Sequence, residues 1–465
     1  MAIPRPRHGL FFAACLALSA VLPRLSAANL YVSPAGSAEA AGSLEAPTTL
    51  ERALARVAPG DTIHLRGGDY AFSSQITIAK DNSGAAAAPK KLVAYAPPGG
   101  EAERPRLDFS GQTYAKNNNV RGLQLNGDWW HIRGLEVFGS ADNGIYIGGS
   151  HNIVERCVTH HNRDTGLQIG RATVTDADPA AWPSHNLVLN CVSHDNYDAP
   201  PGAGENADGF ACKLTTGPGN VFRGCVAYHN IDDGWDLYSK AKTGAIGAVV
   251  LDQCVAYANG TLSDGTQSAK GDRNGFKLGG SKIPVPHVVT RCIAFDNGKN
   301  GFTWNSNPGA IRMINNLAWD NAQGNYKFDS PEAIFLNNLS FFTDGRAPGK
   351  SDRYGGPSGT PTGATNVFWS TAGKTRHRND RGFVVTAASF VSLAAPAGGY
   401  FPRAADGSLA LGDFARLVAG SPLIDAGELP AEALRAELPY DLASAYDGAP
   451  DLGARETGKA VSAAR

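Results

Sequence analysis

Charged side chains recur around three glycines in the middle of this chain, at spacings that would bring them together on a sheet. The segments read ENADGF at 205–210, DDGWDL at 232–237 and NGFKL at 274–278. When the glycines are aligned, the second residue after each is Ala211, Asp236 and Lys277, and apolar residues flank it on both sides. This alternation predicts strands with one buried face, so the middle column should face solvent. Because aligned positions in stacked parallel strands lie about 4.8 Å apart, we expect Lys277 beside Asp236.

Carboxylates dominate this predicted patch, which is typical of a site for a hard cation. The column just before the glycine adds Asp208 and Asp233, and Asp232 stands one residue earlier. Clustered oxygen donors favour calcium over magnesium. An Asp-Gly pair is also common in turns, but Asp236 does not stand in such a pair. The expected calcium ligands are therefore Asp208, Asp232, Asp233 and Asp236.

Lys277 is the expected catalytic residue of the patch. A bound cation would offset the neighbouring carboxylates and lower the pKa of the amine, which could then act as a general base. The matching reaction removes a proton next to a carboxylate whose charge the cation masks. In a uronic-acid polymer this is the proton on C5, and loss of the 4-linked sugar completes a β-elimination. Arg273, Lys213 and Tyr238 are expected to bind substrate, Arg273 through a substrate carboxylate.

A repeat runs through the region that carries the patch. Asparagines recur at 162, 196, 230, 259, 297 and 321, in steps of 34, 34, 29, 38 and 24 residues. Such a period predicts a solenoid, and short strands without intervening helices select a parallel β-helix. We expect the asparagines to form a buried amide ladder and the cysteines five residues before them to be buried thiols. The longer steps predict loops at 171–184, 197–204 and 260–273 that wall a groove beside the carboxylates.

The two ends of the chain differ from the repeat region. Residues 1–27 combine arginines, a short apolar run and small residues, which predicts a signal peptide and secretion to the extracellular space or periplasm. We expect the β-helix domain over 28–345, with a short helix capped by Thr48 closing its N-terminal end. Residues 346–465 are expected to form a loop, the closing turns and the C-terminal cap of the same domain. We expect a monomer with no membrane span, and the net charge of −1 gives no support for a nucleic-acid partner.

The three glycine-centred segments, in this order and spacing, resemble the family 9 polysaccharide lyases, which are pectate lyases. The resemblance implies an all-β fold, a right-handed parallel β-helix with a short N-terminal capping helix and a loop-rich C-terminal cap. It also implies that the four aspartates of the patch bind Ca²⁺ and that Lys277 is the base. The implied substrate is an acidic polysaccharide, polygalacturonate.

Other functions remain open at this point. A lyase acting on alginate, a glycosaminoglycan or rhamnogalacturonan would use the same fold and the same chemistry, because loops set substrate choice. A non-catalytic β-helix that binds polysaccharide would need the aspartates only for structural calcium. A glycoside hydrolase is disfavoured, since it requires a pair of carboxyl groups at a defined separation and would leave Lys277 without a role.

Overall fold

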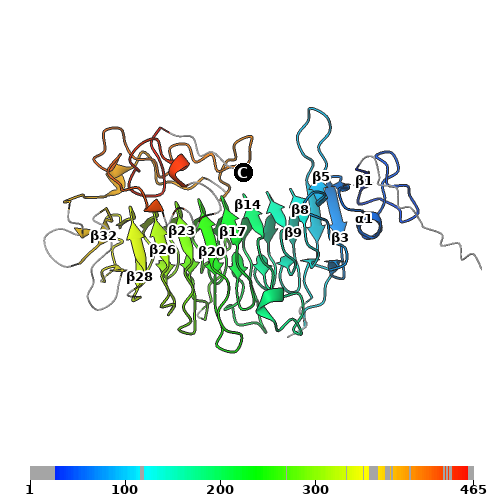
Figure 1. Cartoon of the computed structure of the whole chain (residues 1–465), viewed down its shortest axis with the longest axis horizontal. Coiled ribbons are helices and arrows are strands. Elements are labelled where there is room, and N and C mark those ends of the chain that lie inside the picture. The colour runs from blue at the N-terminus through cyan, green and yellow to red at the C-terminus, as the bar shows by residue number, and fades with distance from the viewer. Residues whose placement is uncertain are drawn as a thin grey trace, which may run out of the picture.

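The computed structural model describes residues 27–115, 120–268, 270–330, 332–348, 350–354, 365–371, 377–378, 381–396, 399–432, 435, 438 and 442–458. Over these residues the chain winds into a right-handed parallel β-helix, and each complete turn adds one strand to each of three parallel sheets (Figure 1). The predicted fold class is confirmed. Residues 1–26, which make up nearly all of the predicted signal peptide, lie outside the described residues.

The three sheets are named here A, B and C in the order in which one turn of the chain visits them. Sheet A contains β1 (Asn29–Val32), β2 (Thr62–Leu65), β5 (Lys90–Ala94), β8 (Trp130–Arg133), β11 (Ile153–Glu155), β14 (Leu187–Leu189), β17 (Asn220–Arg223), β20 (Val249–Asp252), β23 (Val288–Thr290), β26 (Arg312–Ile314) and β29 (Ile334–Leu336). Sheet B contains β3 (Gly68–Ala71), β6 (Pro105–Asp108), β9 (Glu136–Phe138), β12 (Val158–His160), β15 (Val192–His194), β18 (Val226–Tyr228), β21 (Val255–Tyr257), β24 (Ile293–Phe295), β27 (Leu317–Trp319) and β30 (Leu339–Phe341). Sheet C contains β4 (Ile76–Ile78), β7 (Leu123–Leu125), β10 (Ile145–Ile147), β13 (Leu167–Ile169), β16 (Phe210–Cys212), β19 (Trp235–Asp236), β22 (Phe276–Lys277), β25 (Asn300–Thr303), β28 (Gly324–Phe328) and β31 (Arg353–Tyr354).

The corner between sheets A and B is a single residue in the left-handed backbone region. Arg156, Gln253 and Arg291 occupy this corner in three turns, with φ of 52°, 54° and 53°. Side chains other than glycine rarely adopt this conformation, because Cβ crowds the following carbonyl at a cost of roughly 1–2 kcal/mol. The surrounding ladders of hydrogen bonds must offset that cost in these turns, whereas Gly134 and Gly224 occupy the same corner without it.

The predicted asparagine ladder is confirmed at the corner between sheets B and C. The side-chain amide of Asn196 donates to Asn230 at 2.8 Å, and that of Asn230 donates to Asn259 at 3.0 Å. Each side-chain oxygen also accepts the backbone N–H of the asparagine one turn earlier, such as Asn196 N–H on Asn230 at 3.3 Å. The ladder therefore satisfies buried polar groups that bending the chain would otherwise leave unpaired.

Aromatic and sulfur side chains fill the interior of the solenoid. Phe210, Trp235 and Phe276 stack in consecutive turns with ring centres 4.8 Å apart. The cysteines predicted to be buried thiols are all buried and free, namely Cys157, Cys191, Cys225, Cys254 and Cys292. Burying one large apolar side chain stabilises a fold by about 1.5–3 kcal/mol, so this continuous column holds the turns in register.

The predicted N-terminal helix is present as α1 (Leu50–Arg56), but Thr49 rather than Thr48 caps it. The Thr49 hydroxyl accepts the Arg52 N–H at 3.3 Å. Thr48 is instead paired with Val32 in an isolated parallel bridge, so its backbone is already committed to β structure. The apolar side of α1 joins the interior cluster of the solenoid, as expected for a cap.

Most of the described part of the C-terminal region lies along the outer face of sheet B, where Figure 1 shows it as an orange-to-red segment beside the solenoid, and Leu442 and Tyr446 pack on Val288 and Ile314 of sheet A. Its aromatic residues Phe390, Phe401 and Phe414 pack on a column that includes Tyr257 and Phe295. The short elements outside the three sheets are η1 (Pro179–Ala181), β32 (Phe368–Trp369), β33 (His377–Arg378), η2 (Ala387–Ser389) and η3 (Leu442–Ala445). Within the described residues no helix has the length and apolar character needed to cross a membrane.

Candidate active site

The register of sheet C brings the three glycine-centred segments together. Ala211 of β16 pairs with Asp236 of β19, and Asp236 pairs with Lys277 of β22. The apolar residues on either side of this column point inward and are fully buried, for example Trp235 and Leu237. Lys277 therefore lies beside Asp236 on adjacent strands, as predicted. The column does not face solvent as expected, because Ala211, Asp236 and Lys277 are all buried.

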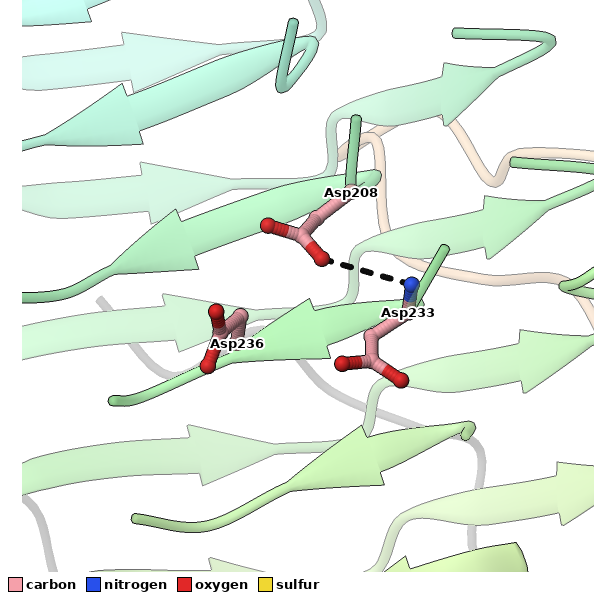
Figure 2. Close-up of side chains that lie close together, drawn as sticks. All are labelled: Asp208, Asp233 and Asp236. Carbon is pink, nitrogen blue, oxygen red and sulfur yellow. Dashed lines mark hydrogen bonds between the residues drawn. The ribbon is translucent and has the colours of Figure 1, made fainter. Parts of the chain in front are cut away.

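Asp208, Asp233 and Asp236 form a compact group of carboxylates. One oxygen from each lies within 4.8 Å of the others. Asp208 and Asp233 stand two residues before the first residues of β16 and β19, and Asp236 lies on β19 (Figure 2). The Asp233 N–H donates to Asp208 Oδ1 at 3.3 Å, the contact drawn as a dashed line. Asp208 and Asp233 are fully buried and Asp236 nearly so, which is a costly place for three like charges.

Two lysines supply the positive charge next to these carboxylates. Lys277 Nζ lies 3.2 Å from Asp233 Oδ2 and 3.6 Å from Asp236 Oδ2. Lys213 Nζ donates to Asp208 Oδ2 at 2.6 Å and to Asp236 Oδ2 at 3.3 Å. Asp236 thus stands between both amines. Lys213, which the sequence assigned to substrate, is part of the same charged cluster as the predicted base.

Burial and mutual repulsion change the protonation of the cluster. Burial raises the pKa of Asp208 to about 6 and that of Asp233 to about 7, although the lysines act in the opposite direction. Burial alone would lower the pKa of Lys277, but the carboxylates of Asp236 and Asp233 outweigh it and hold the pKa well above its usual value. Without a cation the carboxylates outnumber the neighbouring lysines, and Lys277 keeps its proton.

The remaining predicted site residues lie at the margin of the cluster. One oxygen of Asp232 accepts the backbone N–H of Asp272 and, at 3.4 Å, that of Arg273, and Asp232 is outside the compact group of three. The Arg273 side chain packs against Gly260, and among the described residues its buried Nε has no hydrogen-bond partner. The Tyr238 ring centre lies 5.8 Å from Lys277 Nζ, and its hydroxyl is 2.8 Å from Ser281 Oγ.

Sequence reasoning missed two residues that contact the site. Asp272 Oδ2 lies 3.1 Å from Lys277 Nζ, and its other oxygen binds Lys299 at 2.6 Å. Asp272 ends the insertion at 260–273, where no repeat position predicts its place. Asn274 donates both its backbone N–H, at 2.7 Å, and its side-chain amide, at 2.9 Å, to Asp233 Oδ1. Its place in the column of Asp208 and Asp233 was the available signal.

The three predicted loops lie around the cluster in different ways. The segment 171–182 borders a groove that also includes Lys213. The loops at 197–204 and 260–273 contact each other, since Ser268 Oγ donates to Ala203 O at 3.0 Å. Leu262 packs with Ala207 just before β16. The predicted groove beside the carboxylates is thus present, with the first loop as one wall.

Comparison with known proteins places this architecture in a family. A family model described as "Pel9A-like, right handed beta helix region" matches residues 30–338. This chain belongs to the Pel9A-like family. Among its relatives, Pectate lyase L of Paenibacillus polymyxa (strain SC2) is 52% identical over 403 residues, which cover 87% of this chain and 84% of that protein. Pectate lyase PEL9 of Emericella nidulans is 35% identical, over 71% of this chain and 82% of that protein.

Solved structures agree with the assignment to the Pel9A-like family. The crystal structure of pectate lyase Pel9A matches with a TM-score of 0.72 and 32% identity, over 93% of this chain and 96% of that chain. A rhamnogalacturonan lyase matches with a TM-score of 0.69 at 24% identity, over 84% of this chain and 96% of that chain, and it shares the fold. The resemblance to family 9 polysaccharide lyases seen in the three sequence segments is confirmed.

Proposed function

We propose that this protein is a secreted, calcium-dependent pectate lyase that cleaves polygalacturonate by β-elimination, with Lys277 as the general base. Membership of the Pel9A-like family and similarity to proteins named pectate lyase support the activity. Secretion is supported by the signal-peptide pattern of residues 1–27. The observation that carries the mechanism is the position of the Lys277 amine, 3.2 Å from Asp233 and 3.6 Å from Asp236, beside a buried group of carboxylates.

The carboxylates have the chemistry of a calcium site. Calcium accepts six to eight oxygen ligands, and three oxygens from Asp208, Asp233 and Asp236 already converge within 4.8 Å. Asp236 Oδ1 is buried without a hydrogen-bond partner, so one oxygen of the group has no use within the described chain. These residues fit the ion, and Asp232, adjacent to Asp233, is proposed as the fourth ligand.

Lys277 would move the proton in this reaction. Calcium bound to the aspartates would offset their charge and draw electron density from a substrate carboxylate, which makes the neighbouring C–H more acidic. The same offset of charge would lower the pKa of Lys277, and its neutral amine would then accept the proton from C5 while the C–H electron pair becomes the C4–C5 double bond. The bond between C4 and the glycosidic oxygen breaks, and that oxygen leaves with its electron pair and takes a proton from solvent. The Tyr238 ring lies beside the amine, with its centre 5.8 Å from Lys277 Nζ.

The proposal is tested by ultraviolet absorbance of the unsaturated product during incubation with polygalacturonate. We expect product formation with calcium, none with excess chelator, and a loss of at least 100-fold in Lys277→Ala, in line with the 10²–10⁴-fold contribution of a general base. Lys91→Ala, an exposed lysine on β5 of sheet A, is the matched control and should retain full activity. Near-normal activity of Lys277→Ala would remove the base assignment. If the wild type is inactive on polygalacturonate but active on alginate or rhamnogalacturonan, the proposed substrate is wrong.

A further inference from the structure

A groove of about 950 Å³ opens on the outer face of sheet C, on the N-terminal side of the carboxylate cluster. Its floor includes Tyr146 of β10 and Gln168 of β13, and its walls include segments 171–182 and 240–243. Lys213 lines the groove and also binds Asp208 and Asp236, so the groove leads directly into the proposed active site. None of the proposed catalytic steps uses the rest of this surface.

One wall of the groove carries cations that are not neutralised. Arg171, Lys240 and Lys242 each follow a strand of sheet C or lie just beyond it, and all three line the groove. Lys240 and Lys242 are exposed. Among the described residues, the side chains of these three make no ion pair, whereas most other cations near the site, such as Lys213 and Lys299, are paired.

The acidic groups of the groove cannot offset this charge. Asp142 Oδ2 lies 3.5 Å from Arg121 Nε, and the Arg121 guanidinium lies 3.7 Å from the centre of the Tyr146 ring, so this pair is neutral as a unit. Burial and the neighbouring Asp142 raise the pKa of Asp164 to about 7, which leaves it partly protonated at neutral pH. The groove therefore presents a net positive wall at Arg171, Lys240 and Lys242, over a polar floor.

We propose that Arg171, Lys240 and Lys242 bind the carboxylates of the uronate units that precede or follow the unit held at Lys277. This inference rests on the proposed function and extends it to the residues that select an unesterified chain. Strands β10, β13, β16, β19 and β22 lie side by side in sheet C, and four spacings of about 4.8 Å give a track of about 19 Å from the groove to Lys277. A track of that length accommodates several sugar units, each with a carboxylate that a cation can pair.

The side chains on the floor complete the fit to a sugar polymer. Gln168 and Asn143 offer amide donors and acceptors, and Asn143 Nδ2 already contacts Asp164 Oδ1 at 3.1 Å. Hydroxyl groups of a sugar can exchange with such contacts, whereas a neutral methyl ester would leave the cations of the wall without partners. The wall thus favours chains with free carboxylates.

The test compares steady-state kinetics of the wild type with Arg171→Ala and with the double variant Lys240→Ala/Lys242→Ala. We expect KM on polygalacturonate to rise about 5- to 20-fold in each, with kcat within 2-fold, because these groups bind substrate distant from the bond that breaks. Arg171→Lys should restore most of the lost affinity, since the charge is retained. The difference in KM between the variants and the wild type should become smaller at higher salt, because salt screens the attraction between the cations of the wild type and the substrate carboxylates. On highly methyl-esterified pectin the same variants should differ less than 2-fold from the wild type.

Matched controls separate this inference from the proposed function. Lys91→Ala removes an exposed lysine of sheet A, distant from the groove, and should leave KM unchanged. Binding of an oligogalacturonate to Lys277→Ala, measured by calorimetry, reports the groove without turnover, and Arg171→Ala in that background should weaken it 5-fold or more. Unchanged KM in both groove variants of an active enzyme would overturn the inference alone. An inactive wild type that still binds the oligomer through Arg171 would overturn the proposed function but not the groove.

Discussion

Sheets B and C carry outward columns built with the same spacing but with opposite content. On sheet B the column runs through Tyr228, Tyr257, Phe295 and Trp319, with ring centres 5.1, 4.8 and 4.4 Å apart. Phe401 and Phe414 of the C-terminal region cover it. On sheet C the corresponding column runs through Ala211, Asp236, Lys277 and Thr303, and a groove rather than a cover lies beside it.

In both sheets the strand register places equivalent residues next to each other. Whether this arrangement stabilises the protein depends on which side chains occupy those positions. Parallel in-register strands place like residues side by side, and stacked aromatic rings gain from that arrangement. Buried carboxylates lose from it, because repulsion and desolvation add up unless cations intervene. Sheet B therefore stabilises the molecule, whereas the cluster of like charges on sheet C costs stability, which is typical of a functional site.

The largest effect is expected from a substitution that interrupts the aromatic column of sheet B and leaves sheet C unchanged. Phe295→Ala removes a ring that stacks on both Tyr257 and Trp319, and we expect unfolding free energy to fall by about 3–5 kcal/mol. Chemical denaturation measures the loss, and kcat of the folded variant, assayed well below its unfolding temperature, should stay within 2-fold of the wild type. A large fall in kcat with unchanged stability would contradict the separation of roles between the two sheets.

A smaller effect is expected when the charge of sheet C is changed without its shape. Asp233→Asn keeps an oxygen that can accept from Asn274 but removes a charge from the carboxylate group. We expect calcium affinity and activity to fall about 100-fold, or about 2.7 kcal/mol. Calorimetric titration with calcium measures the first, and Asp81→Asn, an exposed aspartate near the N-terminal cap, is the control. A calcium titration equal to that of the wild type would refute the role of Asp233 as a ligand.

The smallest expected effect is on the pH dependence of stability, which should come from the carboxylates of sheet C. The folded pKa values of Asp208 and Asp233, about 6 and about 7, lie above the ordinary value of 3.8. Their contribution to stability is therefore full below pH 3.8 and is lost as pH rises through about 6 to 7. In chelator, the unfolding temperature of the wild type relative to Asp233→Asn should fall between pH 5 and pH 8. Calcium should reverse that trend, and a pH-independent difference would exclude Asp233 as the titrating group.

Much of the fold and the centre of the site could be predicted because both follow from a repeat. The alternation around Gly209, Gly234 and Gly275 sets which side chains point outward, and in-register stacking then places Asp236 beside Lys277. The asparagine ladder and the buried cysteines follow from the same periodicity. These features depend on local pattern and on a single spacing, so they need no knowledge of distant packing.

The residues that could not be predicted lie where the repeat is interrupted. Asp272 reaches Lys277 from the end of an insertion whose path no period fixes. The contacts of long side chains also do not follow from strand register. Lys213 binds Asp208, and Arg273 packs against Gly260. The helix is capped by the residue after the predicted Thr48, because Thr48 is paired with Val32 in a β-bridge.

The left-handed corner residues have a consequence for how such a protein can change over time. Each corner resets the direction of the chain, so the separation of Asp236 and Lys277 across two strands does not depend on the long stretch of sequence that joins them. Insertions between sheets C and A, or between sheets B and C, can change in length and sequence while Asp236 and Lys277 keep their spacing. The β-helix therefore allows the loops that line the groove to vary in sequence without changing the spacing of Asp236 and Lys277.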